Sequence, residues 1–99
     1  MPRDPEQILK VIEAHRDKIR GFGVRRLGLF GSAARGEATE SSDLDFLVEL
    51  ENETFDAYMD LKFFLEKLFN CRVDLVLPDT IKPRLRTSIL SETIYATRL

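Results

Sequence analysis

The sequence predicts an α/β (α+β) fold, in which a small mixed sheet is covered by helices. Apolar residues recur at three- and four-residue spacing in two long segments, a pattern typical of helices that bury one side. Shorter runs rich in β-branched and apolar residues lie between and after them and predict strands. The resulting element order is α-β-α-β-α-β-α, and the order of the strands within the sheet cannot be deduced from it.

The first helix is predicted from its start signals. Asp4 is a suitable N-cap, Pro5 suits the first helical position and Gln7 completes a capping box. One stripe of the helix carries Ile8, Val11, Ile12, His15 and Ile19, and Gly21 and Gly23 end the run. His15 is therefore interpreted as a histidine at the core edge rather than a catalytic group, because no Ser or Cys partner is obvious.

Two strands follow, separated by a polar loop. Residues 24–30 predict the first strand, in which Gly28 allows another segment to approach closely. Residues 31–42 are too short and polar to supply core. Residues 43–51 alternate cleanly, with one face formed by Leu44, Phe46, Val48 and Leu50 and the other by Asp43, Asp45, Leu47 and Glu49.

The remaining elements are a long helix, a third strand, a short helix and a terminal segment. Thr54 can cap a helix that runs to about Phe69, with Asn70 at its end. Residues 71–77 predict a strand that Pro78 closes, and residues 83–90 a shorter helix. Residues 93–99 form either an edge strand or a tail.

Two side chains of the long helix lie outside the arc that suits the sheet. That arc consists of Ala57, Tyr58, Leu61, Phe64, Leu65, Leu68 and Phe69. Met59 and Phe63 lie on the far flank, so either they dock another protein chain or Phe63 tucks under the chain termini.

Composition excludes several classes of protein. The 99 residues suit one domain, and 15 Lys+Arg against 17 Asp+Glu give a net charge of -2, which disfavours direct nucleic-acid binding. Cys71 and His15 are the single cysteine and histidine, so neither an internal disulfide nor a Cys/His zinc site is expected. No signal peptide or spanning helix is evident, and we expect a cytoplasmic protein without membrane contact.

The chemistry is expected between residues 31 and 45. Asp43 and Asp45 project from one strand face, where their repulsion favours a cation between them, and oxygen ligands favour Mg²⁺ or Mn²⁺. Asp74 interrupts the apolar third strand. If that strand pairs beside the second, three carboxylates converge and could hold two metal ions about 3.5–4 Å apart. The alternative is a solvated face on which Asp74 pairs with Arg72 or Arg84.

A phosphate cradle is encoded directly upstream. Gly31 and Ser32 follow the first strand in a loop with Gly36, and offer backbone N–H groups and a hydroxyl to a phosphate. Arg35 adds a cation. A phosphate cradle and a carboxylate cluster within fifteen residues indicate a nucleotide site.

These residues resemble a known family. Gly31-Ser32, ten residues and Asp43-Leu44-Asp45 resemble the signature of the polymerase-β-type nucleotidyltransferases. The string from Phe30 to Gly36, with Ser42 before Asp43, is similar to the minimal nucleotidyltransferase branch, whose members consist of little more than the catalytic core. The resemblance covers the whole chain and implies a single nucleotidyltransferase domain over residues 1–99.

The resemblance implies a role for each site residue. Gly31 and Ser32 would hold the β- and γ-phosphates of a nucleoside triphosphate, and Arg35 would contact phosphate or steady the loop. Asp43 and Asp45 would ligate both Mg²⁺ ions. Asp74 would complete the nucleophile-side metal and help deprotonate the acceptor hydroxyl, which attacks the α-phosphorus and releases pyrophosphate.

The resemblance also implies an acceptor. Members of the minimal branch act as antitoxins of HEPN ribonuclease toxins, so it implies transfer of AMP from ATP to a tyrosine of the toxin. Two alternatives stay open: a binding-only antitoxin with this fold, and a transferase for a small hydroxylated molecule. The sequence does not settle homo- or hetero-oligomeric assembly.

Overall fold

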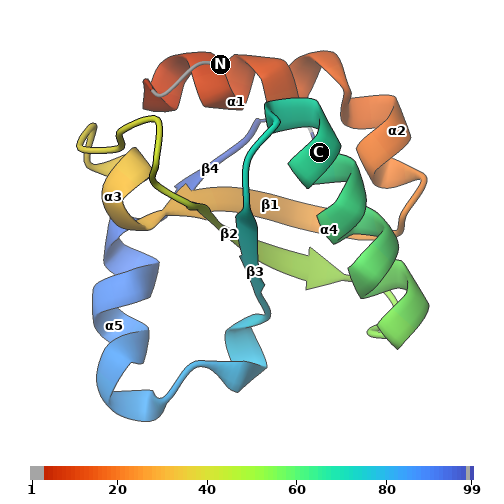
Figure 1. The fold of residues 1–99 in the computed structure, drawn as a ribbon. Helices are drawn as coiled ribbons and strands as arrows, with labels where there is room; N and C mark the ends of the chain where they lie inside the picture. The colour runs from red at the N-terminus through yellow and green to blue at the C-terminus, as the bar shows by residue number, and fades with distance from the viewer. Residues whose placement is uncertain (1–3, 98) are drawn as a thin grey trace.

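The sheet has four strands in the order β3-β2-β1-β4 (Figure 1). The protein is described here from a computed structural model that covers residues 4–97 and 99. Strand β1 (Val24–Phe30) pairs antiparallel with β2 (Leu44–Leu50) on one side and β4 (Ile94–Tyr95) on the other. Strand β2 pairs parallel with β3 (Val73–Val76), so the sheet is mixed, as predicted.

One face of the sheet carries the main core. Helices α1 (Pro5–Ala14), α2 (Arg16–Arg20) and α4 (Phe55–Phe69) pack on it. They bury their apolar side chains against the inward residues of β1, β2 and β3; the helical contributors are Ile8, Ile12, Ile19, Leu61, Leu65 and Phe69. Within β2 the predicted alternation is confirmed, because Leu44, Phe46, Val48 and Leu50 all face this core.

The predicted single N-terminal helix is wrong at one residue, because the helix breaks at His15. The backbone of His15 has φ −109° and ψ 20°, and its N–H bonds the carbonyl of Ile12 rather than continuing the α-helical ladder. Its Nδ1 lies 2.9 Å from the carbonyl oxygen of Val11. The side chain is exposed and packs edge-on against Phe64, with ring centroids 6.2 Å apart.

Helix α4 follows its predicted bounds. Thr54 accepts a hydrogen bond from the Ala57 N–H at 3.1 Å, and Asn70 ends the helix in the left-handed region at φ 52°. Three residues of the predicted arc are fully buried. Phe63 is 58% exposed, so the alternative in which it tucks under the chain termini is wrong.

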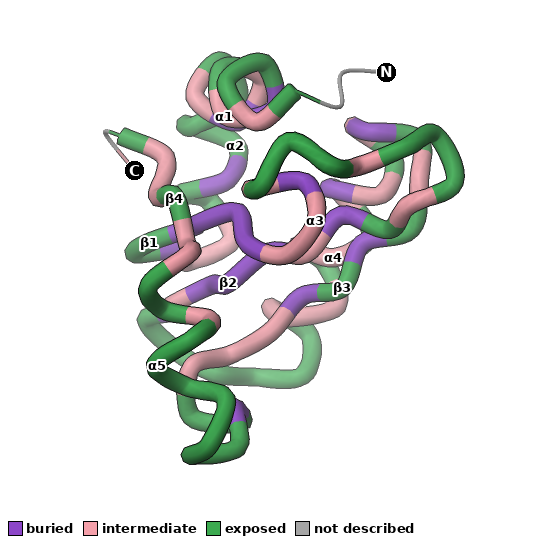
Figure 2. Tube along the Cα trace, turned by 90° about the vertical axis from the view of Figure 1, so that its left-hand side faces the viewer, coloured by how far each residue is buried: buried purple, intermediate pink, exposed green. Residues whose placement is uncertain are grey.

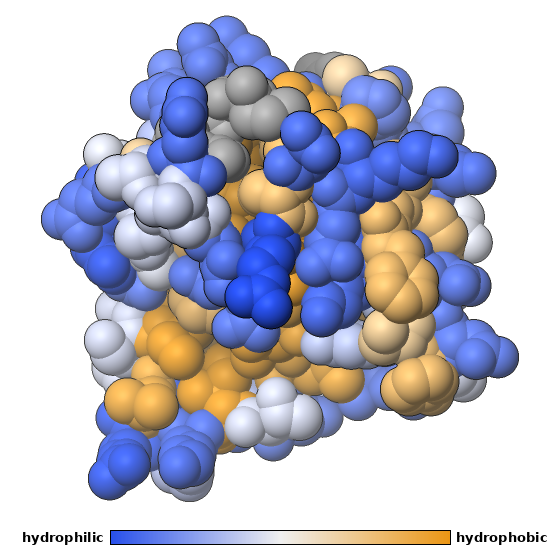
Figure 3. All heavy atoms as spheres, viewed as in Figure 1, coloured by the Kyte–Doolittle hydropathy of each residue, from blue (hydrophilic) through white to orange (hydrophobic). Residues whose placement is uncertain are grey.

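The opposite face of the sheet is thinly covered. Helix α3 (Gly31–Ala34), the 3₁₀ turn η1 (Pro78–Thr80) and helix α5 (Pro83–Glu92) border it, and Phe30, Leu47 and Ile81 form a small second core there. Helix α5 has no buried residue, which Figure 2 shows as green and pink along its length. Apolar surface gathers in the lower part of Figure 3, where α5 and η1 lie in Figure 1.

Two predicted boundaries shift. Helix α5 extends two residues beyond the predicted end, to Glu92, and the third strand is limited to Val73–Val76. Between the two alternatives for residues 93–99, the structure shows a short edge strand, β4.

Among the described residues, no helix is long and apolar enough to cross a membrane.

Candidate functional site

The predicted aspartates lie at one end of the thinly covered face. Asp45 on β2 and Asp74 on β3 are direct register partners across the parallel pair, and Asp43 immediately precedes β2. The strand pairing on which their convergence depended is therefore present. The predicted alternative partners of Asp74 are absent, because no ion pair among the described residues includes this side chain.

Burial and repulsion within this group both act on the pKa of Asp45. Burial raises the pKa of Asp45 to about 6, and the negative charges of Asp74 and Asp43 add to the rise, while Arg35 opposes it. A half-buried carboxylate surrounded by other carboxylates favours either a proton or a cation.

The donor set fits a divalent cation, although the side chains do not enclose one as they stand. All three groups offer carboxylate oxygens, the ligands that Mg²⁺ and Mn²⁺ prefer. Among the described residues, no three His, Cys, Asp or Glu side chains are arranged so that they could hold an ion. The aspartates would have to turn toward a shared ion.

Gly31 is required by the closeness of Asp45. It has a positive φ of 73°, and a Cβ atom at this position would collide with the Asp45 carboxylate. A side chain at residue 31 would therefore be strained and would displace the carboxylate. The predicted phosphate loop and the predicted carboxylate cluster are in direct contact.

Ser32 and the loop that follows are partly exposed. The Ser32 carbonyl accepts a hydrogen bond from the Glu37 N–H at 2.8 Å, which folds the loop back after α3. In the part of the chain that the structure describes, the Ser32 hydroxyl makes no hydrogen bond. Farther along, the Ser42 hydroxyl accepts from the Thr39 N–H at 2.9 Å and orders the approach to Asp43.

Arg35 is held between two carboxylates. Its Nε donates to Glu37 at 3.0 Å, and its Nη1 donates to Glu92 at 3.0 Å. Both hydrogen bonds raise the pKa of Arg35, and the bond to Glu37 has the larger effect. The cation predicted for this loop is therefore present, but it is paired with these two carboxylates.

Glu92 is the site residue that the sequence did not reveal. Its Oε1 accepts from the Gly31 N–H at 2.9 Å, across 61 residues of chain. The one signal in the sequence is weak: an acidic residue in the last turn of a helix, where the helix dipole disfavours a negative charge. Nothing local to α5 points to Gly31.

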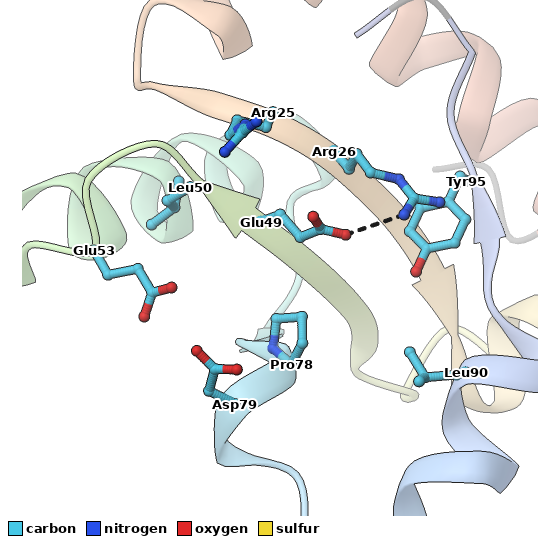
Figure 4. A pocket seen from close by; sticks show the side chains of 9 residues that line it. All are labelled: Arg25, Arg26, Glu49, Leu50, Glu53, Pro78, Asp79, Leu90 and Tyr95. Atoms are coloured by element: carbon cyan, nitrogen blue, oxygen red, sulfur yellow. Dashed lines mark hydrogen bonds and ion pairs between the residues drawn. The ribbon is translucent and has the colours of Figure 1, made fainter.

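A hollow of about 520 Å³ lies farther along the same face (Figure 4). Its lining includes Arg26, Glu49, Asp79, Leu90 and Tyr95. Arg26 bonds Glu49 at 3.2 Å and stacks over the Tyr95 ring at 3.8 Å. Glu49 is four residues along β2 from Asp45, about 13 Å at the rise of a strand. The hollow therefore lies on the same face as the aspartates, but none of the predicted site residues lines it.

Known proteins are similar to this chain in sequence and fold. Residues 8–96 match the family model of the nucleotidyltransferase domain. The protein adenylyltransferase MntA of Thermococcus cleftensis is 40% identical over 92 residues, covering 91% of this chain and 93% of that protein.

Solved structures of related proteins have a similar fold. A structure described as a candidate minimal nucleotidyltransferase has a TM-score of 0.71 and 42% identity, covering 87% of this chain and 93% of that one. A toxin–antitoxin complex with AMP-PNP has a TM-score of 0.67 and 25% identity, covering 88% of this chain and 69% of that one.

Proposed function

The chain belongs to the nucleotidyltransferase-domain family, in its minimal nucleotidyltransferase branch, and from this membership we propose that it transfers AMP from ATP to a tyrosine of a cognate HEPN toxin. It is a nucleotidyltransferase, and adenylyl transfer to the toxin would make it the antitoxin of the pair. We further propose that residues 1–99 act as a single catalytic domain, in the cytoplasm.

One observation carries the proposal. The loop of Gly31, Ser32 and Arg35 lies against the end of the sheet at which Asp45 and Asp74 are paired. Groups suited to a triphosphate and groups suited to its metal ions are therefore in contact. The relatives support the choice of substrates: one is named a protein adenylyltransferase, and one related structure is a toxin–antitoxin complex with AMP-PNP, an ATP analogue.

Each site residue would have its own role in the reaction. Gly31 and Ser32 would hold the β- and γ-phosphates and Arg35 would neutralise part of their charge, which orients the α-phosphorus for in-line attack. Asp43, Asp45 and Asp74 would hold Mg²⁺, two ions if both positions fill, which supplies charge stabilisation to the phosphates and the acceptor oxygen. The acceptor oxygen forms the new bond to phosphorus, the bond to the bridging oxygen breaks, and pyrophosphate leaves. Asp74 would help to take the hydroxyl proton.

The test is a transfer assay with the product of the neighbouring gene as the candidate toxin. We expect label from α-³²P-ATP to appear on the toxin in the presence of Mg²⁺, to be lost in EDTA, and to map to a tyrosine by mass spectrometry. Label that appears on a small hydroxylated acceptor but never on the toxin would favour that alternative class. Inhibition of the toxin without any transfer would indicate a binding-only antitoxin.

A further inference from the structure

Glu92 makes two contacts in the proposed phosphate site. Its Oε1 accepts from the Gly31 N–H at 2.9 Å, and its Oε2 accepts from Arg35 Nη1 at 3.0 Å. Both oxygens of one anionic group are thus engaged by a backbone N–H and a guanidinium, donors that suit phosphate equally well. A carboxylate from a distant helix occupies the donors that the proposed function assigns to ATP.

Apart from these contacts, the position is unfavourable for a negative charge. Glu92 ends α5, where the helix dipole repels anions, and the last turn of α5 contains no basic residue to offset it. The charge of Glu92 also contributes to the raised pKa of Asp45, after burial, Asp74 and Asp43. The contacts with Gly31 and Arg35 therefore offset the unfavourable position of the Glu92 charge at the end of α5.

A triphosphate cannot use these donors while Glu92 holds them. The Glu92 side chain is 26% exposed, so rotation of this side chain alone frees the two donors. The helix can stay in place, and Ile89 in its last turn keeps its packing against the second core. The carboxylate can leave at small structural cost.

We propose that Glu92 is an exchangeable occupant of the triphosphate anchor, which holds Gly31 and Arg35 in the nucleotide-free protein and is displaced by the phosphates of ATP. Glu92 thereby sets the affinity for the nucleotide. This inference rests on the proposed function, since it takes Gly31 and Arg35 as phosphate-binding groups.

The test is the affinity of Glu92→Gln for ATP. Glutamine keeps the length of the side chain and can still accept from the Gly31 N–H, but it loses the ion pair with Arg35. Calorimetry in EDTA at low salt should show ATP binding tightened about three- to tenfold relative to the unmodified protein, the effect of removing one competing partner. Weaker or unchanged binding would overturn the proposal, because a residue that merely braces the loop would not compete.

Glu37→Gln is the matched control. It removes the same charge from the other carboxylate that contacts Arg35, but Glu37 does not contact Gly31. A general reduction of negative charge predicts equal tightening in both variants, and that result would also overturn the proposal. We expect Glu92→Gln to exceed Glu37→Gln by about threefold or more.

A second measurement needs no variant. In ¹H–¹⁵N spectra of the unmodified protein, the Gly31 amide and the Arg35 Nη signals should move together as inorganic tripolyphosphate is added, because these are the donors that Glu92 occupies. Signals that stay fixed while tripolyphosphate binding saturates would contradict displacement. If no variant binds ATP even with Mg²⁺, the proposed function fails as well; if ATP binds and Glu92→Gln is no tighter than Glu37→Gln, the inference about Glu92 fails alone.

Discussion

Asp45 is the residue of the candidate site with the most unusual surroundings. It is half-buried against Gly31, paired in register with Asp74, and close enough to Asp43 and Glu92 for their charges to act on it. Its raised pKa means that the folded, metal-free protein holds a proton more tightly than the unfolded chain does. The nucleotide-free protein is therefore destabilised by ionisation at this residue, and a bound cation would relieve that cost.

We predict that Asp45→Asn abolishes transfer and stabilises the metal-free protein. Loss of one carboxylate should lower the transfer rate by at least about 100-fold, because charge developing on the phosphates loses its stabilisation. The pKa of about 6 lies above the ordinary value of 3.8, so stability contributed by Asp45 is present below about pH 4 and lost as pH rises through 6.

The melting temperature of Asp45→Asn in EDTA should therefore exceed that of the unmodified protein by an amount that grows from pH 4 to pH 7. Glu49→Gln, on the same strand and the same face, is the matched control and should show no such growth. A gap that stays constant with pH would contradict the assignment of the raised pKa to Asp45.

A second prediction concerns Ser32→Ala. The hydroxyl makes no hydrogen bond within the described residues and belongs to the proposed phosphate-binding loop, so its removal should weaken ATP binding by about three- to tenfold. The free energy of unfolding should change by less than about 0.5 kcal/mol. Calorimetry with ATP and Mg²⁺, paired with urea denaturation, measures both. Ser41→Ala in the same loop should leave the affinity unchanged; equal losses in the two variants would remove Ser32 from the site.

At the scale of elements, β4 holds α5 beside the site. Gly28 on β1 pairs with Tyr95, and a Cβ at residue 28 would meet the Thr93 methyl at 2.5 Å and the Tyr95 ring at 2.9 Å. The close approach predicted for Gly28 from the sequence is thus made by the segment that follows Glu92. The position of Glu92 depends on a glycine in another strand.

We predict that Gly28→Ala displaces β4 and lowers the free energy of unfolding by about 1–3 kcal/mol, the usual cost of overpacking. Urea denaturation measures the loss. Adding Thr93→Ser removes the nearest methyl group and keeps the hydroxyl that donates to the Ile89 carbonyl at 2.6 Å, so the double variant should recover part of the stability. No recovery would mean that the Tyr95 ring, rather than Thr93, sets the cost.

At the scale of the whole molecule, the two faces of the sheet are built differently. One carries the buried core beneath α1, α2 and α4, and the other carries the carboxylates, the hollow and the thinly packed α5. Two phenylalanines of α4 remain exposed on the helix side, Phe55 at 76% and Phe63 at 58%. The candidate site and these two phenylalanines therefore lie on different sides of the sheet.

We predict that Phe63→Ser weakens assembly with the toxin or with a second copy of the chain, while the fold is retained. A large exposed aromatic side chain beside the half-buried Met59 is more typical of an interface than of free surface. Size-exclusion chromatography and pull-down with the toxin measure the loss. Phe55→Ser, also exposed on α4, is the control; unchanged assembly in Phe63→Ser would place the interface elsewhere.

The sequence alone determined the parts of this protein that depend on local patterns. Some features depend only on residues close together in the sequence, so they could be predicted from it. They are the helix caps at Asp4 and Thr54, the left-handed helix end at Asn70 and the alternation of residues 44–50. The loop and the first two aspartates were readable for the same reason, because fifteen residues encode them together.

Tertiary structure decided what depends on long-range pairing. Asp74 reaches Asp45 because β3 lies parallel beside β2, which no local signal specifies. The helix break at His15 was not predicted, because the apolar spacing continues unbroken through that residue and a single backbone turn leaves no local mark. Glu92 reaches Gly31 across 61 residues because β4 pairs with β1 and carries the end of α5 back to the loop. Such contacts depend on how strands are ordered in the sheet, and side-chain periodicity fixes only which way each strand faces.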